Sequence, residues 1–316
     1  MIDQAGAYAA CNDSTRIIID EARRRGIDVV ISDPELGELE LRHEGVVRHA
    51  FQSLSDLTSA IAFRRCDDKL LTRRVLEAAG LPVAPGRLVG DDDEADLAFL
   101  AEHGSVVLKP CRGEGGAGIT VGVTDAGGLR QAVASAREVC GQVLLEAVAD
   151  GDDLRILVIG GEVVAASVRQ PPVVTGDGER TVRALVEARN EERIAAGGFA
   201  TRLDGITEAT VRAGGHGLDD VLPAGEEVVV RRTANLHTGG TIHDRTDELH
   251  PALADLALRA TAAIDLPVAG VDLMVRDPAA AGPAVVIEVN EQPGLANHEP
   301  QPTTQRYLDL LFPATA

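Results

Sequence analysis

Residues 106–121, Val-Val-Leu-Lys-Pro-Cys-Arg-Gly-Glu-Gly-Gly-Ala-Gly-Ile-Thr-Val, form the stretch on which the interpretation of the fold depends. An apolar, β-branched run carries Lys109, a loop with four glycines in six residues follows, and a second apolar run begins at Ile119. This order predicts a β-hairpin. Glycines let backbone N–H groups approach an anionic ligand closely, so the loop is typical of a lid over phosphates.

The candidate phosphate-binding residues of this lid are Lys109, Gly113, Gly115, Gly116 and Gly118. The spacing of three of these glycines also matches the dinucleotide-binding fingerprint, but that motif must open a helix, and an apolar strand pattern follows here. A P-loop is excluded because no Gly-Lys-Ser or Gly-Lys-Thr closes the motif. An ordinary glycine-rich hairpin turn remains the alternative.

Lysine is rare in this chain: among 30 basic residues only Lys69 and Lys109 are lysines, and the rest are arginines. A compact ammonium group is not interchangeable with a planar guanidinium, so we interpret both lysines as site residues. Lys69 falls in the first turn of a helix predicted over residues 67–80, and the N-terminus of a helix favours anions.

Length and composition bound the class of protein. With 316 residues and 45% hydrophobic content, the chain predicts a globular protein of two or three subdomains. The net charge of −20 disfavours nucleic acid or an anionic membrane as partner, and no apolar run approaches the roughly 20 residues that span a bilayer. The four cysteines lack metal-binding spacing, and with no signal peptide recognised we expect a cytoplasmic protein without disulfides.

The pattern of elements predicts three parts along the chain. The first is a small α/β domain with a hairpin, the second holds the glycine lid, and the third carries the acidic strands described below. The third part is predicted to include one charged helix, residues 181–196, followed by a polar connector. The expected boundaries are 1–66, 67–147 and 148–316.

Two apolar strands predicted over residues 270–275 and 285–290 carry oxygen-bearing side chains. Glu288 and Asn290 point the same way by the two-residue period of a strand, and Asp272 can face them from the neighbouring strand. Two carboxylates and a carboxamide are ligands that Mg²⁺ accepts when phosphates complete its shell. The alternative is the polar face of an edge strand.

Two further segments carry candidate site residues. Asp153 and Arg155 lie two apart on a predicted strand, so they share one face and can meet one ligand; exposed charges on an edge strand are the alternative. Residues 227–240 show the same order of features as the lid. A predicted strand carries a basic residue, Arg231, and a turn with asparagine and paired glycines follows.

From about residue 14 to residue 300, the order of these parts resembles an ATP-grasp carboxylate–amine ligase. The resemblance is greatest to the ligase modules of cyanophycin synthetase and bifunctional glutathione synthetase. It is carried by Asp68-Lys69, Val107-Leu108-Lys109-Pro110, Leu145-Glu146, Asp153-Leu154-Arg155, Gly176-Asp177-Gly178, residues 231–240 and Glu288-Val289-Asn290-Glu291-Gln292-Pro293-Gly294.

This resemblance implies an α+β ATP-grasp fold, with a nucleotide between two α+β subdomains and a small α/β domain before them. It implies that Lys69 and Lys109 contact the phosphates of ATP. Glu146 would lie at the adenine and ribose end, and Asp153 near the ribose or the substrate entrance. The implied metal ligands, for Mg²⁺ or alternatively Mn²⁺, are Asp272, Glu288 and Asn290.

The same resemblance assigns catalytic roles. Arg155 and Arg231 would neutralise the transferring phosphate or a substrate carboxylate, and Asn235, Gly239 and Gly240 would line an acyl-phosphate site. The implied reaction joins a carboxylate to an amine at the expense of ATP, with amino acids or small peptides as substrates and a γ-glutamyl or other dipeptide as product. Related ligases often associate, so we expect a dimer or tetramer.

Three other functions remain open from the sequence. A small-molecule kinase would use the same apparatus and leave the phosphate on its product. A nucleotide sensor would need no turnover, although the metal-ligand pattern argues against it. A ligase that modifies the tail of a protein has no recognisable sequence signal here.

Overall fold

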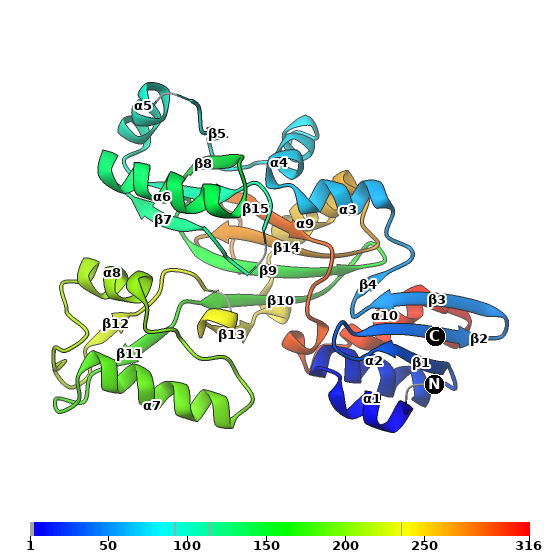
Figure 1. Ribbon diagram of the computed structural model, residues 1–316. Helices are drawn as coiled ribbons and strands as arrows, with labels where there is room; N and C mark the ends of the chain where they lie inside the picture. Colours follow the sequence, from blue (N-terminus) through cyan, green and yellow to red (C-terminus); the bar gives the residue numbers. More distant parts are fainter. Residues whose placement is uncertain (1–2, 92, 114, 235) are drawn as a thin grey trace. The chain divides into compact units, whose positions relative to one another are not determined.

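The computed structural model describes residues 3–91, 93–113, 115–234 and 236–316 and has an α+β fold (Figure 1). The chain alternates between two compact units. Unit 1 comprises residues 1–84, 149–167 and 244–316, and unit 2 comprises residues 85–148 and 168–243. The three predicted domain boundaries stay a prediction.

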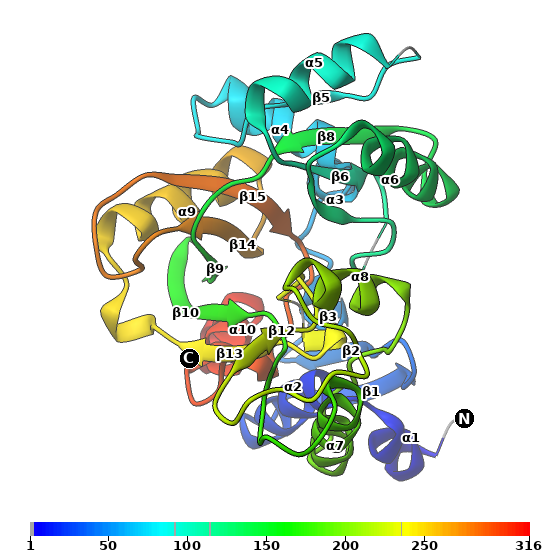
Figure 2. The same ribbon diagram turned by 90° about the vertical axis from the view of Figure 1, so that its left-hand side faces the viewer.

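The N-terminal part of unit 1 is a four-stranded antiparallel sheet backed by helices, as Figure 2 shows. Leu39 and Leu41 alternate with polar neighbours and are fully buried against the helices, which fixes the face that the sheet presents to the core. Strands β2 and β3 pair antiparallel, so the predicted hairpin is confirmed. The elements are α1 (Gln4–Ala10), α2 (Asp13–Arg24), β1 (Asp28–Asp33), β2 (Glu38–His43), β3 (Val46–Phe51), β4 (Leu54–Ser55) and the C-terminal α10 (Thr303–Leu311).

The main sheet has the strand order β13-β10-β9-β14-β15. Strand β14 is buried along nearly its whole length, and helix α9 packs on β9, β14 and β15. Helices α3 and α4 also contact β15 and α9. The bounds are α3 (Ala60–Asp67), α4 (Lys69–Ala78), β9 (Asp152–Ile159), β10 (Glu162–Gln170), β13 (Thr241–Asp244), α9 (Pro251–Ile264), β14 (Val268–Val275) and β15 (Ala284–Asn290).

The first part of unit 2 is a four-stranded sheet of order β5-β8-β6-β7. Helices α5 and α6 supply its core, in which Leu100, Leu108, Leu129 and Leu145 are buried. Strands β6 and β7 pair antiparallel on either side of the glycine loop, which confirms the predicted hairpin. The bounds are β5 (Gly86–Leu88), α5 (Glu94–His103), β6 (Val106–Pro110), β7 (Thr120–Val123), α6 (Ala126–Val139) and β8 (Val143–Ala147).

The second part of unit 2 has a small core of its own, built from Val182, Leu185, Val211 and Val228 among others. The predicted charged helix is confirmed as α7, but the connector after it contains a second helix, α8, that the sequence did not predict. Asp204 caps that helix by accepting bonds from two backbone amides. The bounds are β11 (Val173–Thr175), α7 (Val182–Ala195), α8 (Gly205–Ala213) and β12 (Glu227–Val229).

Four short 3₁₀ turns complete the described structure: η1 (Leu236–Thr238), η2 (Thr246–Glu248), η3 (Leu295–His298) and η4 (Pro313–Thr315). Within the described ranges, every helix is too short or too polar to cross a membrane.

Candidate active site

The acidic residues of β14 and β15 lie together in unit 1. Asp272 stands directly opposite Glu288, and Gly270 stands opposite Asn290, in the antiparallel register of the two strands. The Asn290 side-chain amide donates to Asp272 Oδ2 at 3.3 Å and to the Gly270 carbonyl at 3.2 Å. Asp272 is buried and its two neighbours are half-buried. The structure thus brings the three predicted metal ligands together.

Two cations compensate these carboxylates. Arg155, opposite Asp272 on β9, donates through Nη2 to Asp272 Oδ2 at 2.9 Å and through Nε to Oδ1. Lys69 Nζ lies 3.2 Å from Glu288 Oε1. Lys69 is the first residue of α4, whose N-cap is Asp68, so the predicted position in the first helical turn is confirmed. Each predicted carboxylate ligand therefore already has a cationic neighbour, as a buried charge requires.

The oxygen cluster fits a hard cation such as Mg²⁺. Asp272, Glu288 and Asn290 offer carboxylate and amide oxygens on adjacent strands, the donor chemistry that Mg²⁺ prefers. Among the described residues, no three His, Cys, Asp or Glu side chains form a metal-binding group. The third oxygen-bearing side chain of the cluster is Asn290, which turns its amide nitrogen toward Asp272 here. Asp153 lies two residues before Arg155 on β9, opposite Met274, and is half-buried.

Cys66 lies in α3, close enough to the acidic cluster for the carboxylate charges to affect the pKa of its thiol. Burial raises the pKa of the Cys66 thiol far above its usual value, and the charges of Glu291 and Glu288 raise it further. A thiol held in its neutral form is a poor nucleophile. Cys66 is also buried, so it is not a candidate nucleophile.

Lys109 and Glu146 form a second charged pair, in unit 2. Their strands β6 and β8 are neighbours, and Lys109 Nζ lies 2.7 Å from Glu146 Oε2. Both residues are more than 90% buried, with 9% and 7% of their surface exposed. The structure thus joins the lysine predicted to contact phosphate to the acid predicted at the adenine and ribose end.

The four lid glycines have two different surroundings. All four have positive φ angles, a conformation that favours glycine. A Cβ on Gly113 would lie about 2.9 Å from the Val139 side chain, and a Cβ on Gly118 would lie about 2.9 Å from the Pro110 side chain. These two glycines therefore allow the loop to pack closely against its neighbours. A Cβ on Gly115 or Gly116 would meet no atom within 4 Å. The backbone at Gly115 and Gly116 is therefore the open part of the lid.

Arg231 was predicted to lie on a strand, and the structure places it after the strand. Strand β12 ends at Val229, so Arg231 follows the strand instead of projecting from it. Its Nη1 and Nη2 atoms each lie about 3 Å from the Asp204 carboxylate, and Nη1 also donates to Thr207 Oγ1 at 3.3 Å. The buried guanidinium therefore joins the start of α8 to the end of β12.

The predicted acyl-phosphate residues fall at the turn before β13. Gly239 and Gly240 are buried, and a Cβ on Gly240 would lie 2.7 Å from the Ala234 carbonyl oxygen, so only glycine fits there. Asn235 lies outside the described residues. Sequence reasoning missed Asp204 and the arginines of α7 that contact this turn, because their partners are distant in the chain.

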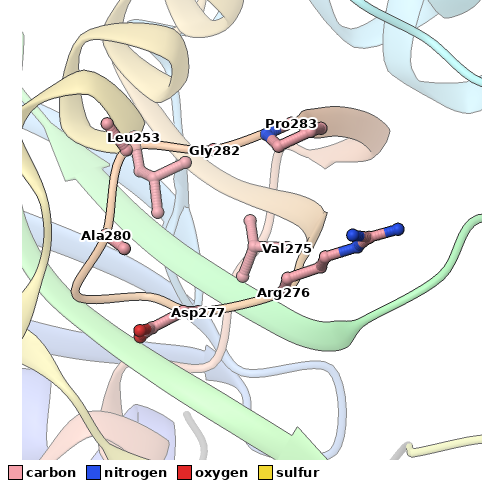
Figure 3. Close-up of a pocket in the computed structure, with 8 residues that line it drawn as sticks. Leu253, Val275, Arg276, Asp277, Ala280, Gly282 and Pro283 are labelled. Carbon is pink, nitrogen blue, oxygen red and sulfur yellow. The ribbon is translucent and has the colours of Figure 1, made fainter.

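A mostly apolar hollow of about 210 Å³ lies at the turn between β14 and β15 (Figure 3). Leu253 and Val275 line it, and the turn residues 276, 277 and 280–283 complete it. It includes none of the predicted site residues. The clusters described above, and not this hollow, are the candidates for chemistry.

Comparisons with known proteins agree with this architecture. Residues 74–191 match the family described as prokaryotic glutathione synthetase, ATP-grasp domain, and residues 223–306 match the RimK-like ATP-grasp domain. The chain is 33% identical over 323 residues to cyanophycin synthetase of Nostoc sp., covering 96% of this chain and 35% of that protein. It is 29% identical over 317 residues to the glutathione biosynthesis bifunctional protein of Clostridium perfringens, covering 95% of this chain and 41% of that protein.

A solved structure shows the same likeness in three dimensions. The bifunctional glutathione synthetase from Pasteurella multocida superposes with a TM-score of 0.67 at 26% identity, over 97% of this chain and 44% of that one. The chain thus spans between a third and a half of the length of the relatives described here. By its fold and by both domain matches, the chain is an ATP-grasp protein related to cyanophycin synthetase and bifunctional glutathione synthetase.

Proposed function

We propose that this protein is an ATP-dependent ligase that joins a carboxylate to an amine through an acyl phosphate, releasing ADP and phosphate. The proposed substrates are amino acids or small peptides, and the proposed product is a dipeptide or γ-glutamyl amide. The observation that carries the proposal is the oxygen cluster of Asp272, Glu288 and Asn290 beside Arg155 and Lys69. The names of the relatives, which refer to cyanophycin and glutathione, support a product with an amide bond.

This reaction requires the protein to neutralise negative charge and to position the reactants, and it requires no nucleophilic side chain. A carboxylate is a poor electrophile because oxygen leaves it poorly, and a phosphoryl group on that oxygen makes it a good leaving group. Asp272, Glu288 and Asn290 would hold Mg²⁺, which neutralises phosphate charge when bound. With their carboxylate partners bound to Mg²⁺, Arg155 and Lys69 would be available to the anionic groups of the reactants.

The elements of unit 2 would contribute nucleotide contacts. Lys109 is proposed to bind phosphate, while Glu146 keeps its ammonium group oriented across the strands. The open backbone at Gly115 and Gly116 is proposed to cover the phosphates and exclude water from the acyl phosphate. Exclusion of water matters because water competes with the amine for the activated carbonyl carbon.

The reaction is tested with Mg-ATP and a pool of amino acids and γ-glutamyl compounds. ADP and free phosphate are measured, and the products are weighed by mass spectrometry. The expected result is equal release of ADP and phosphate with a new mass equal to two pool members minus water. Release of ADP with the phosphate retained on one compound would identify a kinase instead.

Substitution of the cluster tests its role. Asp272→Asn and Glu288→Gln keep the shape of the side chains but remove a negative charge, so we expect kcat to fall by about 100-fold or more. The matched control is Asp28→Asn, which changes an exposed acid on β1 of the same unit. Activity of both cluster variants within twofold of the control, with intact folding, would exclude the proposed metal site.

A further inference from the structure

Three neighbouring side chains of helix α7 bind the backbone of two loops of unit 2. One loop contains Gly239 and Gly240, and the second loop contains Thr201. Arg189 Nη2 donates to the Gly239 carbonyl at 2.9 Å, and Arg193 Nη2 donates to the Gly240 carbonyl at 3.0 Å. The amide of Asn190 exchanges two hydrogen bonds with the backbone of Thr201, at 2.7 and 2.8 Å. The turn proposed to line the acyl phosphate therefore rests on this helix.

Thr201 completes this arrangement from the second loop. Its Oγ1 donates to the Thr238 carbonyl at 3.2 Å, so three consecutive carbonyls, at 238, 239 and 240, accept bonds from side chains. Thr201 is buried, and a Cβ on Gly239 would lie only 2.0 Å from its Oγ1. The turn is thus fixed by direct contacts and not by the general packing of the loop.

The charge of Arg189 and Arg193 is not compensated within the described residues. Although the chain has 50 acidic residues against 30 basic ones, no ion pair to a carboxylate is found for either guanidinium in the part of the chain that the structure describes. Arg183, on the same helix, shows the ordinary arrangement, with its Nε 3.1 Å from Asp219 Oδ1. Two arginines one helical turn apart also repel each other.

One guanidinium nitrogen remains without a hydrogen bond. Arg189 Nη1 is buried and has no partner among the described residues, although each such nitrogen carries N–H donors. Burial lowers the pKa of Arg189, and the charge of Arg193 lowers it further. Leaving a buried charged donor unsatisfied is costly, and an anion at this position would remove the cost.

We propose that Arg189, supported by Arg193, forms an oxyanion subsite on the substrate side of the reaction. The ligand is a carboxylate or phosphoryl group, because an anionic oxygen accepts from the unsatisfied Nη1 donor and offsets the charge of the two arginines. A Cβ on Gly239 would lie 3.4 Å from Arg189 Nη1 but 2.0 Å from Thr201 Oγ1, so an anion reaches Nη1 only by displacing the Thr201 hydroxyl from its place beside Gly239. This inference rests on the proposed function, which places a substrate at this turn.

The subsite couples anion binding to the geometry of the turn. Nη2 of Arg189 donates to the Gly239 carbonyl while Nη1 donates to the oxyanion, so one side chain binds the ligand and also positions the backbone. A lysine at this position can supply a charge and donors from a single nitrogen, but not two donor nitrogens in a fixed planar arrangement.

The test measures the thermal unfolding midpoint of the full chain with inorganic phosphate or L-glutamate, at an ionic strength matched with chloride. We expect at least one of the two to raise the midpoint of the wild type by ~4 °C at saturation. Arg183→Gln, the control on the same helix, should respond like the wild type. Arg189→Gln should lose most of the response, with any remainder coming from the other proposed anion contacts, and Arg189→Lys should fold normally but bind the anion about tenfold more weakly.

The outcomes separate the source of the anion. A response to phosphate alone that depends on Arg189 assigns the subsite to the transferring phosphoryl group, and a response to L-glutamate alone assigns it to a substrate carboxylate. An equal response of Arg189→Gln and Arg183→Gln, or no response of the wild type to either anion, overturns the subsite.

A parallel ligase assay distinguishes this result from the proposed function. If the wild type forms product but its anion response does not depend on Arg189, only the subsite is wrong. If no amide product forms while the Arg189-dependent response persists, the ligase proposal is wrong and the anion site stands.

Discussion

Asp272 and Arg155 hold each other across two neighbouring strands, and Gly270 makes this contact possible. The guanidinium of Arg155 passes over Gly270, where a Cβ would lie 2.9 Å from Nη1 and 3.0 Å from the Cβ of Pro293. Glycine in a buried strand is otherwise unfavourable, since it adds no side chain to the core. Its presence is explained by the space that Arg155 and the loop after Asn290 require.

Replacing this glycine tests that explanation. Gly270→Ala should displace Arg155 from Asp272, lower the free energy of unfolding by about 2 kcal/mol through overpacking, and reduce ligase activity. Urea unfolding and steady-state kinetics measure the two effects. Gly282→Ala is the control, because a Cβ there would meet no atom within 4 Å. Indistinguishable variants would show that Arg155 relaxes without cost.

The sequence allowed the cluster on β14 and β15 to be predicted at the level of single residues. The two-residue period of a strand places Glu288 and Asn290 on one face, and a short connection makes the next strand an antiparallel neighbour. The partner of Arg231 could not be predicted in this way. Asp204 lies 27 residues earlier, in a segment that gave no strand pattern, and no local rule joins the two.

At the scale of elements, Glu21 and Arg25 together link α2 to α10. Glu21 accepts hydrogen bonds from Arg24 and Arg25 at 2.6 to 2.7 Å, and Arg25 also lies 2.6 Å from Asp309 on α10. The bond from Arg24 lowers the pKa of Glu21 most, Arg25 adds to this effect, and burial opposes both. Because the pKa is lowered on folding, this link stabilises the protein above the ordinary pKa of 4.5.

The pH dependence of stability follows from that sign. Glu21→Gln should lower the free energy of unfolding by about 2 kcal/mol at pH 7, and the difference from the wild type should shrink as the pH falls below about 4.5. Urea unfolding at several pH values measures it. The control is Asp13→Asn on the same helix, whose exposed pair with Arg16 should contribute less than about 0.5 kcal/mol. A constant difference across the pH range would contradict this account.

Helices α9 and α8 differ in how clearly their sequences indicate a helix, because they differ in the size of their buried apolar face. Helix α9 has a proline at its first position and a broad apolar face, two features that mark a helix clearly in a sequence. Helix α8 is only nine residues long and buries only Thr207 and Val211, so its buried face is small and gave little signal in the sequence. It is held largely by the Asp204 cap and by Arg231, which are contacts of the folded chain.

At the scale of the whole molecule, charge works against compaction. With a formal net charge of −20, the folded chain repels itself more than the expanded one, and salt screens this repulsion. Raising NaCl from about 0.01 M to about 0.15 M shortens the screening length from about 30 Å to about 8 Å. We expect the free energy of unfolding to rise by ~1 kcal/mol in urea titrations. A decrease would show that attractive ion pairs outweigh the net repulsion.

The pairing of β9 with β14 has a consequence for how this protein is made. Arg155 and Asp272 are 117 residues apart, so at roughly 5–20 residues per second the ribosome needs roughly 6 to 23 seconds to deliver the second strand after the first. During that interval β9 carries an apolar face and a cation without their partner strand. The main sheet of a nascent chain therefore cannot be completed until β14 has emerged.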